Sequence, residues 1–322
     1  MEVYIQGGKT KLSANNEFFI IKDSYGKENK VSKENIDILI LQNECSISSK
    51  AIVLALENDI PIILLDGIGR TIGKFWDCNF SKNSTLRRNQ YRYLDSKFGL
   101  EVIKSWIIKK IKSQKEHLEK IEKYRKNLEF TKEKDTMNNS LEKIDGINEE
   151  LSDVREKIMG YEGVASRAYY LGISKSLPER WNFCEREYQN SKNPYNLILN
   201  YLFGMLYVRC ETELVKVGLD PYAGILHSDG DNKKSLLYDY IEQFRFLAWD
   251  IAYSMFSRKK VALCDFEEKD GKVEISKELR KELAHRFYQK LAQNLEVENQ
   301  ILNYKEVIKL EAKDLAQRLE KL

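Results

Sequence analysis

Proline is scarce in this chain. It occurs four times in 322 residues, where average usage of about 5% would give about 16. Proline lacks the backbone N–H and clashes with the preceding helical turn, so it is the strongest breaker of helices. A chain with so few proline residues can form long helices, and we expect mostly helical structure. At about 100–200 residues per domain, the length suggests roughly two domains.

Residues 1–80 are expected to form a small β-rich domain. Short apolar or alternating runs occur at Val3–Ile5, Phe18–Ile21 and Asp37–Leu41, and turn-forming residues such as Asp23–Gly26 separate them. A serine pair at 48 and 49 can cap a short helix. Pro61–Leu65 is then predicted to be a buried strand.

Three glycines follow that strand, at positions 67, 69 and 73. Their spacing departs from the dinucleotide-binding fingerprint, and no helix is predicted to begin there. We therefore predict a hairpin turn at Asp66–Gly69 leading into Thr71–Trp76, and not a phosphate-binding loop.

Residues 81–322 are expected to form a larger α-helical domain, which makes the fold class α+β and mostly α. From about residue 84 the apolar residues recur at helical spacing, as at Val102, Trp106, Ile107 and Ile111. Thr131–Ser140 is polar and is predicted to be a bend. A stripe with steps of 3, 4, 3 and 4 then runs from Ile144 to Ile158. A long antiparallel helical hairpin accounts for this pattern.

Further helix starts are predicted at Asn193-Pro194, at Ser235 and at Ser276, from capping residues and from proline at the first helical position. The helix after Ser235 is expected to reach about Phe256. Asn196 and Asn200 lie among apolar residues, and we expect them to make structural hydrogen bonds.

The composition is that of a globular protein, with 42% hydrophobic and 32% charged residues. No apolar run approaches the ~20 residues of a membrane helix, and no secretory signal is evident. The five cysteines are scattered without a C-x-x-C pair, which indicates neither a zinc site nor a disulfide framework. We expect a cytoplasmic protein with free thiols.

Positive charge is concentrated in one segment. The formal net charge is only +3, but residues 81–130 carry 14 basic and 6 acidic side chains. Arg87, Arg88 and Arg92 alternate there with Tyr91 and Tyr93, a combination suited to phosphate contact and base stacking. The alternative is a solvated helix face.

The chain has three histidines. His117 and His285 lie in charged helical segments and are expected to be surface or packing residues. His227 follows a short apolar segment, Tyr222–Leu226, and precedes a polar loop. Junctions of this kind often display functional side chains.

Two carboxylates and an arginine follow His227 at helical spacing: Asp239, Glu242 and Arg245. Positions i, i+3 and i+6 project from a similar side of a helix. Two carboxylates beside a histidine form a ligand set that suits Mg²⁺ or Mn²⁺. The alternative is a surface ion pair between Glu242 and Arg245.

A third carboxylate, Glu162, lies on or beside the buried stripe and between Gly160 and Gly163. Glutamate is rarely buried unless it is paired or bound to a metal. Arg167 is about one turn further on, so it could bind a phosphate or form a structural pair with Glu162.

Several motifs in this order resemble one known family. They are Arg87-Arg-x-Gln-Tyr91, Glu162-Gly-x-Ala-x-Arg167, Asn193-Pro-x-Asn196, Gly-x-Leu-His227-Ser228 and Ser235-Leu-x-x-Asp239-x-x-Glu242-x-Phe-Arg245. Each motif is weak evidence alone, but five motifs in this order are specific to one family. The resemblance extends from about Val3 to about Arg258. The chain resembles the CRISPR-associated integrase family, that of the first-numbered Cas protein.

The resemblance implies a divalent metal, Mg²⁺ or Mn²⁺, held by the catalytic residues Glu162, His227 and Glu242, with Asp239 as an accessory acid. It also implies a homodimer, formed through the N-terminal domain, that joins a small ferredoxin-like CRISPR-associated partner. Such an endonuclease and integrase inserts prespacer DNA into the repeat array, with a 3′-hydroxyl as the nucleophile. Nucleic-acid contacts are expected at four arginines: Arg87, Arg88, Arg167 and Arg245.

Two other functions remain open from the residues alone. One is a helical DNA-binding scaffold without catalysis, which would bind DNA in EDTA and cleave none under Mn²⁺. The other is a structural protein whose helical hairpin recruits partners, which would lack DNA affinity at any salt concentration.

Overall fold

The computed structural model describes residues 2–6, 9–42, 45–58, 60–66, 71–75, 84–188, 191–227, 230–231, 233–269, 271–297 and 300–322. The chain divides into two compact units, residues 1–82 and 83–322. The expected domain boundary at residue 80 lies outside the described residues. Within them, no helix is long and apolar enough to cross a membrane.

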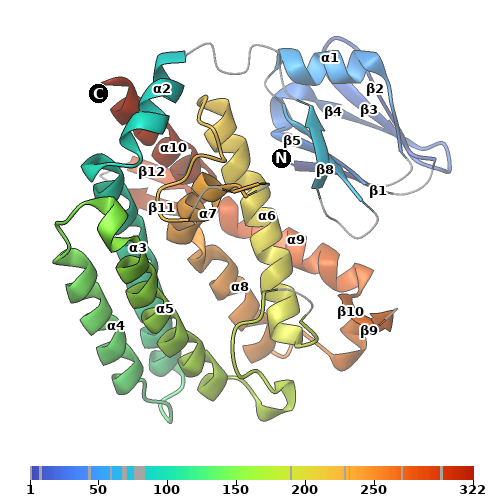
Figure 1. Ribbon diagram of the computed structural model, residues 1–322. Coiled ribbons are helices and arrows are strands. Elements are labelled where there is room, and N and C mark those ends of the chain that lie inside the picture. The colour runs from blue at the N-terminus through green and yellow to red at the C-terminus, as the bar shows by residue number, and fades with distance from the viewer. Residues whose placement is uncertain are drawn as a thin grey trace. The chain divides into compact units, whose positions relative to one another are not determined.

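The first unit holds two four-stranded sheets and one helix (Figure 1). The first sheet has the order β1-β5-β7-β8, with the first three strands parallel and the last one antiparallel: Glu2–Gln6, Ile38–Gln42, Ile62–Leu65 and Thr71–Phe75. The second has the order β4-β3-β2-β6: Glu28–Ser32, Phe18–Lys22, Lys11–Ala14 and Ser46–Ile47. Helix α1 (Ser49–Glu57) is capped by Ser48, whose side chain accepts a hydrogen bond from the Ala51 amide.

The strands predicted from apolar runs are confirmed as β1, β3, β5 and β7. Strand β4 was not predicted, since three of its five side chains are exposed and its sequence carries no apolar run. Strands β7 and β8 pair antiparallel, as a hairpin requires. The predicted turn residues 67–69 and Trp76 lie outside the described residues.

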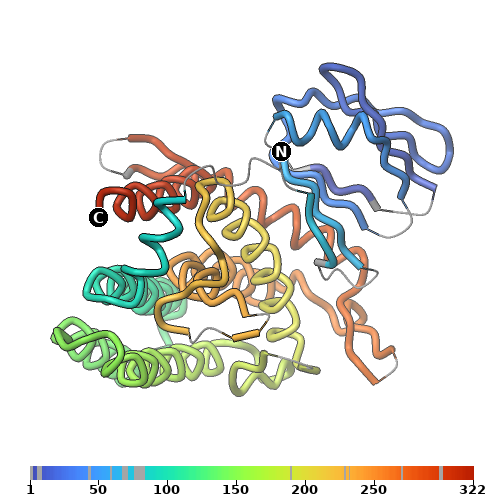
Figure 2. The backbone as a smooth tube through the Cα atoms, turned by 45° about the horizontal axis from the view of Figure 1, so that its top comes forward, coloured from blue at the N-terminus to red at the C-terminus, as the bar shows by residue number. Residues whose placement is uncertain are grey.

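The second unit is mostly helical, and with the first it confirms the α+β, mostly α class. Its helices are α2 Ser84–Tyr93, α3 Lys97–Tyr124, α4 Thr131–Asp145, α5 Leu151–Ser176, α6 Pro194–Lys216, α7 Ser235–Ile241, α8 Phe246–Ser257, α9 Lys277–Leu291 and α10 Tyr304–Glu320. Two short hairpins are inserted near its C-terminal end: β9 Phe266–Lys269 with β10 Lys272–Ile275, and β11 Asn294–Val297 with β12 Gln300–Asn303. Helices α3, α4 and α5 lie side by side (Figures 1 and 2).

The predicted bend at 131–140 is wrong, because this segment is helix α4. Its inward side chains include the polar Glu133 and Ser140 beside Met137, so the apolar stripe is too sparse to be recognised. Glu133 is buried against the ammonium group of Lys175. The chain reverses twice, between Tyr124 and Thr131 and between Asp145 and Leu151. Helices α3 and α5 therefore run parallel, and three helices replace the predicted antiparallel hairpin.

Both predicted caps at Asn193 and Ser276 are confirmed, since each side chain accepts a backbone hydrogen bond at its helix start. The single helix predicted from Ser235 to Phe256 is not continuous. A short 3-10 segment, Glu242–Phe244, separates α7 from α8, and Ser235 is the first residue of α7 rather than its cap. This interruption places Glu242 at a change of helical geometry.

Candidate functional site

A cavity of about 220 Å³ lies in the helical unit. Its lining side chains come from α3, α5, the segments before α6 and α7, and the 3-10 segment: Ile107, Lys110, Met159, Glu162, Ser166, Tyr170, Tyr188, Leu226, His227, Glu242 and Arg245. The structure therefore brings Glu162, His227 and Glu242 to one cavity, although up to 80 positions separate them in the sequence.

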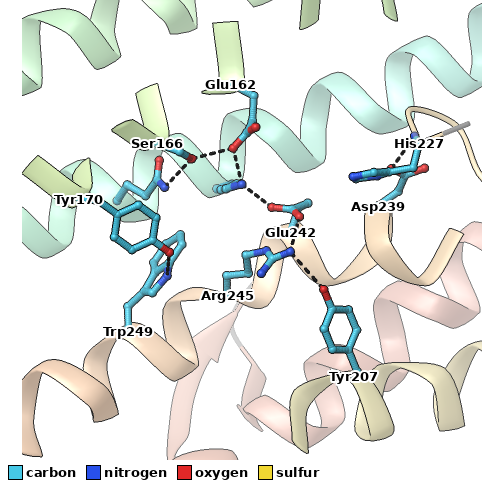
Figure 3. Close-up of polar contacts among 11 residues, drawn as sticks. Glu162, Ser166, Tyr170, Tyr207, His227, Asp239, Glu242, Arg245 and Trp249 are labelled. Carbon is cyan, nitrogen blue, oxygen red and sulfur yellow. Dashed lines mark hydrogen bonds and ion pairs between the residues drawn. The ribbon is translucent and has the colours of Figure 1, made fainter. Parts of the chain in front are cut away.

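Lys110 lies between the two glutamates of the cavity. Figure 3 shows Glu162 and Glu242 projecting toward each other from separate elements. Its ammonium group donates a hydrogen bond to Oε1 of Glu162 and lies 2.5 Å from Oε2 of Glu242. The second contact is also an ion pair, and Oε2 of Glu242 is buried. The lysine side chain is 8% exposed. Burial lowers the pKa of Lys110, but the two glutamates outweigh it and the pKa is raised.

Glu162 projects from α5 toward α3. The hydroxyl of Ser166, one turn further on, donates to Oε1 of Glu162 at 2.6 Å, and Gln114 donates to that hydroxyl at 3.0 Å. A Cβ atom added at Gly160 would meet nothing within 4 Å, which agrees with the exposure of this position on α5. The anticipated pair with Arg167 is absent from the described residues. Arg167 is exposed, and Lys110 takes its place beside Glu162.

Glu242 is held by Arg245, which donates to Oε1 at 2.7 Å. The glutamate and arginine side chains are 6% and 12% exposed, so the expected surface ion pair exists but is buried. Arg245 also donates to the hydroxyl of Tyr207 at 3.3 Å and stacks over the Phe203 ring. Burial raises the pKa of Glu242, but Arg245 and Lys110 outweigh this and lower it to about 2. Glu242 is therefore a permanent anion at neutral pH.

His227 is oriented by Asp239, which is fully buried. The carboxylate accepts backbone hydrogen bonds from Ile225, Leu226 and His227 at 2.7 to 3.2 Å, and its Oδ1 lies 2.5 Å from Nδ1 of His227. A carboxylate only accepts, so Nδ1 carries the proton and Nε2 of the neutral ring is left as the acceptor. Burial lowers the pKa of His227, but Asp239 outweighs it and the pKa is raised.

The close approach of this loop to α7 requires glycine at position 224. A Cβ atom there would lie 2.5 Å from Cβ of Ser235 and 2.7 Å from its carbonyl carbon. Asp239 and Gly224 together fix the backbone that carries His227. Asp239 therefore acts on the site by positioning the histidine.

In the described part of the chain, no three Asp, Glu, His or Cys side chains lie close enough together to hold a metal as they stand. The Lys110 ammonium group occupies the space between the two glutamates. This arrangement still fits a cation site, since two carboxylates from separate elements already bind one cation. Carboxylate oxygens and an imidazole nitrogen are the donors that Mg²⁺ and Mn²⁺ accept.

The basic and aromatic segment predicted to contact nucleic acid is helix α2, whose residues do not line the cavity. Arg88 is exposed, whereas Arg87 is half-buried and donates a long hydrogen bond to the Gly218 carbonyl. The hydroxyl of Tyr91 donates to Asp220 at 2.7 Å. Part of this helix thus anchors the segment that leads to His227.

Arg186 was not predicted. It donates to the side-chain oxygens of Asn196 at 3.0 Å and Asn200 at 2.5 Å, which confirms the structural role expected for both asparagines. The described residues give it no carboxylate partner, and its buried Nε makes no hydrogen bond. Burial lowers its pKa. The Arg186 guanidinium group also stacks over the ring of Tyr188, which lines the cavity. A guanidinium group without a carboxylate partner can bind an anion.

Comparison with known proteins adds independent information. A sequence model described as "CRISPR associated protein Cas1" matches residues 3–289. The chain is 29% identical to the CRISPR-associated endonuclease Cas1 1 of Archaeoglobus fulgidus, over 98% of this chain and 95% of the relative. It is 26% identical to a Cas1 protein of Methanobrevibacter ruminantium, over 85% and 84% of the two chains.

Two solved structures share the fold. A casposase bound to integration product matches with a TM-score of 0.85 at 22% identity, over 99% of this chain and 90% of the other. A Cas1 protein from Thermotoga maritima matches with a TM-score of 0.80 at 18% identity, over 99% and 97%. The family match spans most of the sequence and agrees with the motif order and the fold. The chain belongs to the Cas1 family of CRISPR-associated proteins.

Proposed function

We propose that this protein is a divalent-metal-dependent DNA endonuclease and integrase of CRISPR adaptation, which inserts prespacer DNA into the repeat array. One observation carries the proposal: Glu162 and Glu242, from separate helices, share a cation in a cavity that His227 also lines. It is supported by the relative from Archaeoglobus fulgidus, which is named an endonuclease, and by the casposase structure, which holds an integration product.

Glu162, His227 and Glu242 would hold Mg²⁺ or Mn²⁺. When bound, the metal supplies positive charge to a phosphodiester whose negative charge grows in the transition state. Glu242 is kept ionised by Arg245, and Asp239 turns Nε2 of His227 toward the cavity. Both features keep these two donors in the state that a metal ion requires before any substrate arrives.

In strand transfer, the 3′-hydroxyl oxygen of the prespacer attacks a phosphorus atom of the repeat. A new P–O bond forms, the bond to the leaving 3′-oxygen breaks, and that oxygen takes up a proton. One phosphodiester replaces another, so no nucleoside triphosphate is consumed. Water as the nucleophile would give endonuclease cleavage.

DNA and two kinds of protein partner complete the proposal. Exposed Arg88 and Arg167, together with half-buried Arg87, supply positive charge for the phosphate backbone. Arg186 is a further candidate for phosphate contact, because it has no carboxylate partner among the described residues, whereas Arg245 is paired with Glu242. A homodimer formed through the N-terminal domain and a small ferredoxin-like partner are proposed as well. A protein partner is supported by a solved Cas6-RT-Cas1–Cas2 complex that shares the fold, with a TM-score of 0.80 at 21% identity over 100% of this chain and 35% of the other.

The experiment that tests this proposal is strand transfer of a labelled DNA with a free 3′-hydroxyl into a repeat-containing plasmid, with Mn²⁺ or EDTA. Glu162→Gln, His227→Asn and Glu242→Gln are each expected to reduce the rate by at least about 100-fold, since each removes a metal-binding donor. Glu311→Gln is the control, because Glu311 pairs with the half-exposed Lys109 and does not line the cavity. Wild-type rates in a folded Glu162 or Glu242 variant would refute the assignment. DNA binding in EDTA with no transfer under Mn²⁺ would favour a non-catalytic scaffold.

A further inference from the structure

The two glutamates of the cavity require a positive charge whether or not a metal is bound. Glu242 is almost fully buried and Glu162 is about four-fifths buried. Arg245 donates to Oε1 of Glu242, whereas the buried Oε2 pairs with Lys110. The ammonium group of Lys110 is the one described cation that touches both glutamates.

We propose that Lys110 is a built-in counter-ion of the metal site, which occupies the cation position in the metal-free protein and is displaced when the divalent metal binds. This inference rests on the proposed function and adds to it a residue that sets the affinity for the metal. Lys110 then acts as a competitor of the metal: it neutralises Glu162 and Glu242 until the metal replaces it.

Displacement follows from charge and from the lysine stem. A divalent ion bound by both glutamates would lie within a few Å of the ammonium group, where like charges repel strongly in a partly buried site. The four-carbon side chain lets the ammonium group move into the cavity while helix α3 stays in place. The cavity of about 220 Å³ provides the room.

The alternative is that Lys110 keeps its place and orients the two glutamates around the metal. The two possibilities predict opposite changes on removal of the ammonium group. A displaced competitor lowers the metal affinity, so its loss must strengthen binding. A permanent organiser supports the ligands, so its loss must weaken binding.

The test is Mn²⁺ binding to the DNA-free protein, measured from the signal of free Mn²⁺ by electron paramagnetic resonance. Lys110→Met, which keeps the length and removes the charge, is expected to tighten binding by about tenfold or more. Lys109→Met is the matched control: it removes a charge from the same helix, but Lys109 pairs with Glu311 outside the cavity. The Mn²⁺ affinity of Lys109→Met is expected to stay within about twofold of that of the wild type. Unchanged or weaker binding in folded Lys110→Met would overturn the proposal.

His227→Ala, alone and combined with Lys110→Met, separates this proposal from the proposed function. If His227→Ala weakens Mn²⁺ binding and Lys110→Met leaves it unchanged, only the counter-ion role of Lys110 is overturned. If Mn²⁺ binding is unchanged in His227→Ala, or if no protein binds Mn²⁺, the metal does not bind in this cavity. Either result overturns both the counter-ion role and the metal site of the proposed function.

A second measurement uses the wild-type protein and does not depend on the folding of a variant. An amine-acetylating reagent is applied with and without Mn²⁺, and each lysine is quantified by mass spectrometry. Lys110 is expected to be protected without metal and several-fold more reactive with it, while Lys109 does not change. Equal protection of Lys110 in both states would contradict displacement.

Discussion

His117 is a buried histidine whose protonation should weaken the fold in mild acid. The sequence placed it on a charged helical face, but the residue is only 5% exposed and its Nδ1 lies 2.7 Å from the Tyr169 hydroxyl. Burial lowers its pKa to about 4, with Lys120 and Lys290 acting in the same direction and Asp250 opposing them. Asp250 lies 3.8 Å from Nε2, but this contact is not an ion pair at neutral pH because the ring is uncharged.

The size of the effect follows from the two pKa values. The unfolded chain takes up a proton at His117 below about pH 6.5, whereas the folded protein resists protonation until about pH 4. Between these values the unfolded state binds more protons, so the free energy of unfolding falls as the pH falls. Relative to neutral pH, protonation of His117 should lower the free energy of unfolding by about 2 kcal/mol at pH 5 and by at most about 3 kcal/mol at lower pH.

Urea unfolding of the metal-free protein at pH 7.5 and at pH 5 measures this loss. His117→Gln keeps a polar side chain beside Tyr169 but cannot titrate. From pH 7.5 to pH 5, its free energy of unfolding should therefore fall by about 2 kcal/mol less than that of the wild type. Comparing the two proteins removes the contributions of all other titrating groups. His285→Gln is the control, since His285 is exposed on α9. An equal loss in wild type and His117→Gln would show that the histidine is not buried in its neutral form.

Three further predictions concern the support of the site. Gly224→Ala forces a Cβ atom against Ser235, so it should lower the free energy of unfolding in urea by about 1–3 kcal/mol; no change would mean that the loop lies further from α7. Asp239→Ala releases the ring of His227 and three backbone amides, so the Mn²⁺ dissociation constant should rise by about 10- to 100-fold; an unchanged value would separate Asp239 from the metal site. Arg186→Met should weaken DNA binding and reduce its salt dependence while leaving Mn²⁺ affinity unchanged; an unchanged salt slope would mean that Arg186 contacts no phosphate.

The elements that the sequence predicted correctly share a strong local signal. Ser48, Asn193 and Ser276 are capping residues directly before an apolar period, and all three cap helices. Helix α4 carried no such signal, because its buried face includes Glu133, whose partner Lys175 is 42 positions away. Local patterns cannot reveal a polar side chain that is buried by a distant partner.

The candidate site was predictable only in part, for the same reason. The motifs drew attention to Glu162, His227 and Glu242, each with a recognisable neighbourhood. Lys110 lies in a lysine-rich helical stretch and looked like any other charge there. Its role depends on contacts with residues 52 and 132 positions away, which only the fold brings together.

The contribution of Asp239 also changed with the structure. Its spacing from Glu242 indicated an acid that shares a helix face with it. The 3-10 segment at Glu242 instead turns the two carboxylates to different partners, Asp239 to the His227 loop and Glu242 to Lys110 and Arg245. Helical spacing alone could not predict that interruption, since Glu242–Phe244 contains no glycine or proline.

The most direct test of the central claim is the position of Mn²⁺ in a crystal of the wild-type protein, located by its anomalous scattering. A single strong peak is expected within about 2.0–2.6 Å of donor atoms from Glu162, His227 and Glu242, with the Lys110 ammonium group moved away from both glutamates. A peak elsewhere, or none in the cavity at saturating Mn²⁺, would contradict the metal site on which the proposed function depends.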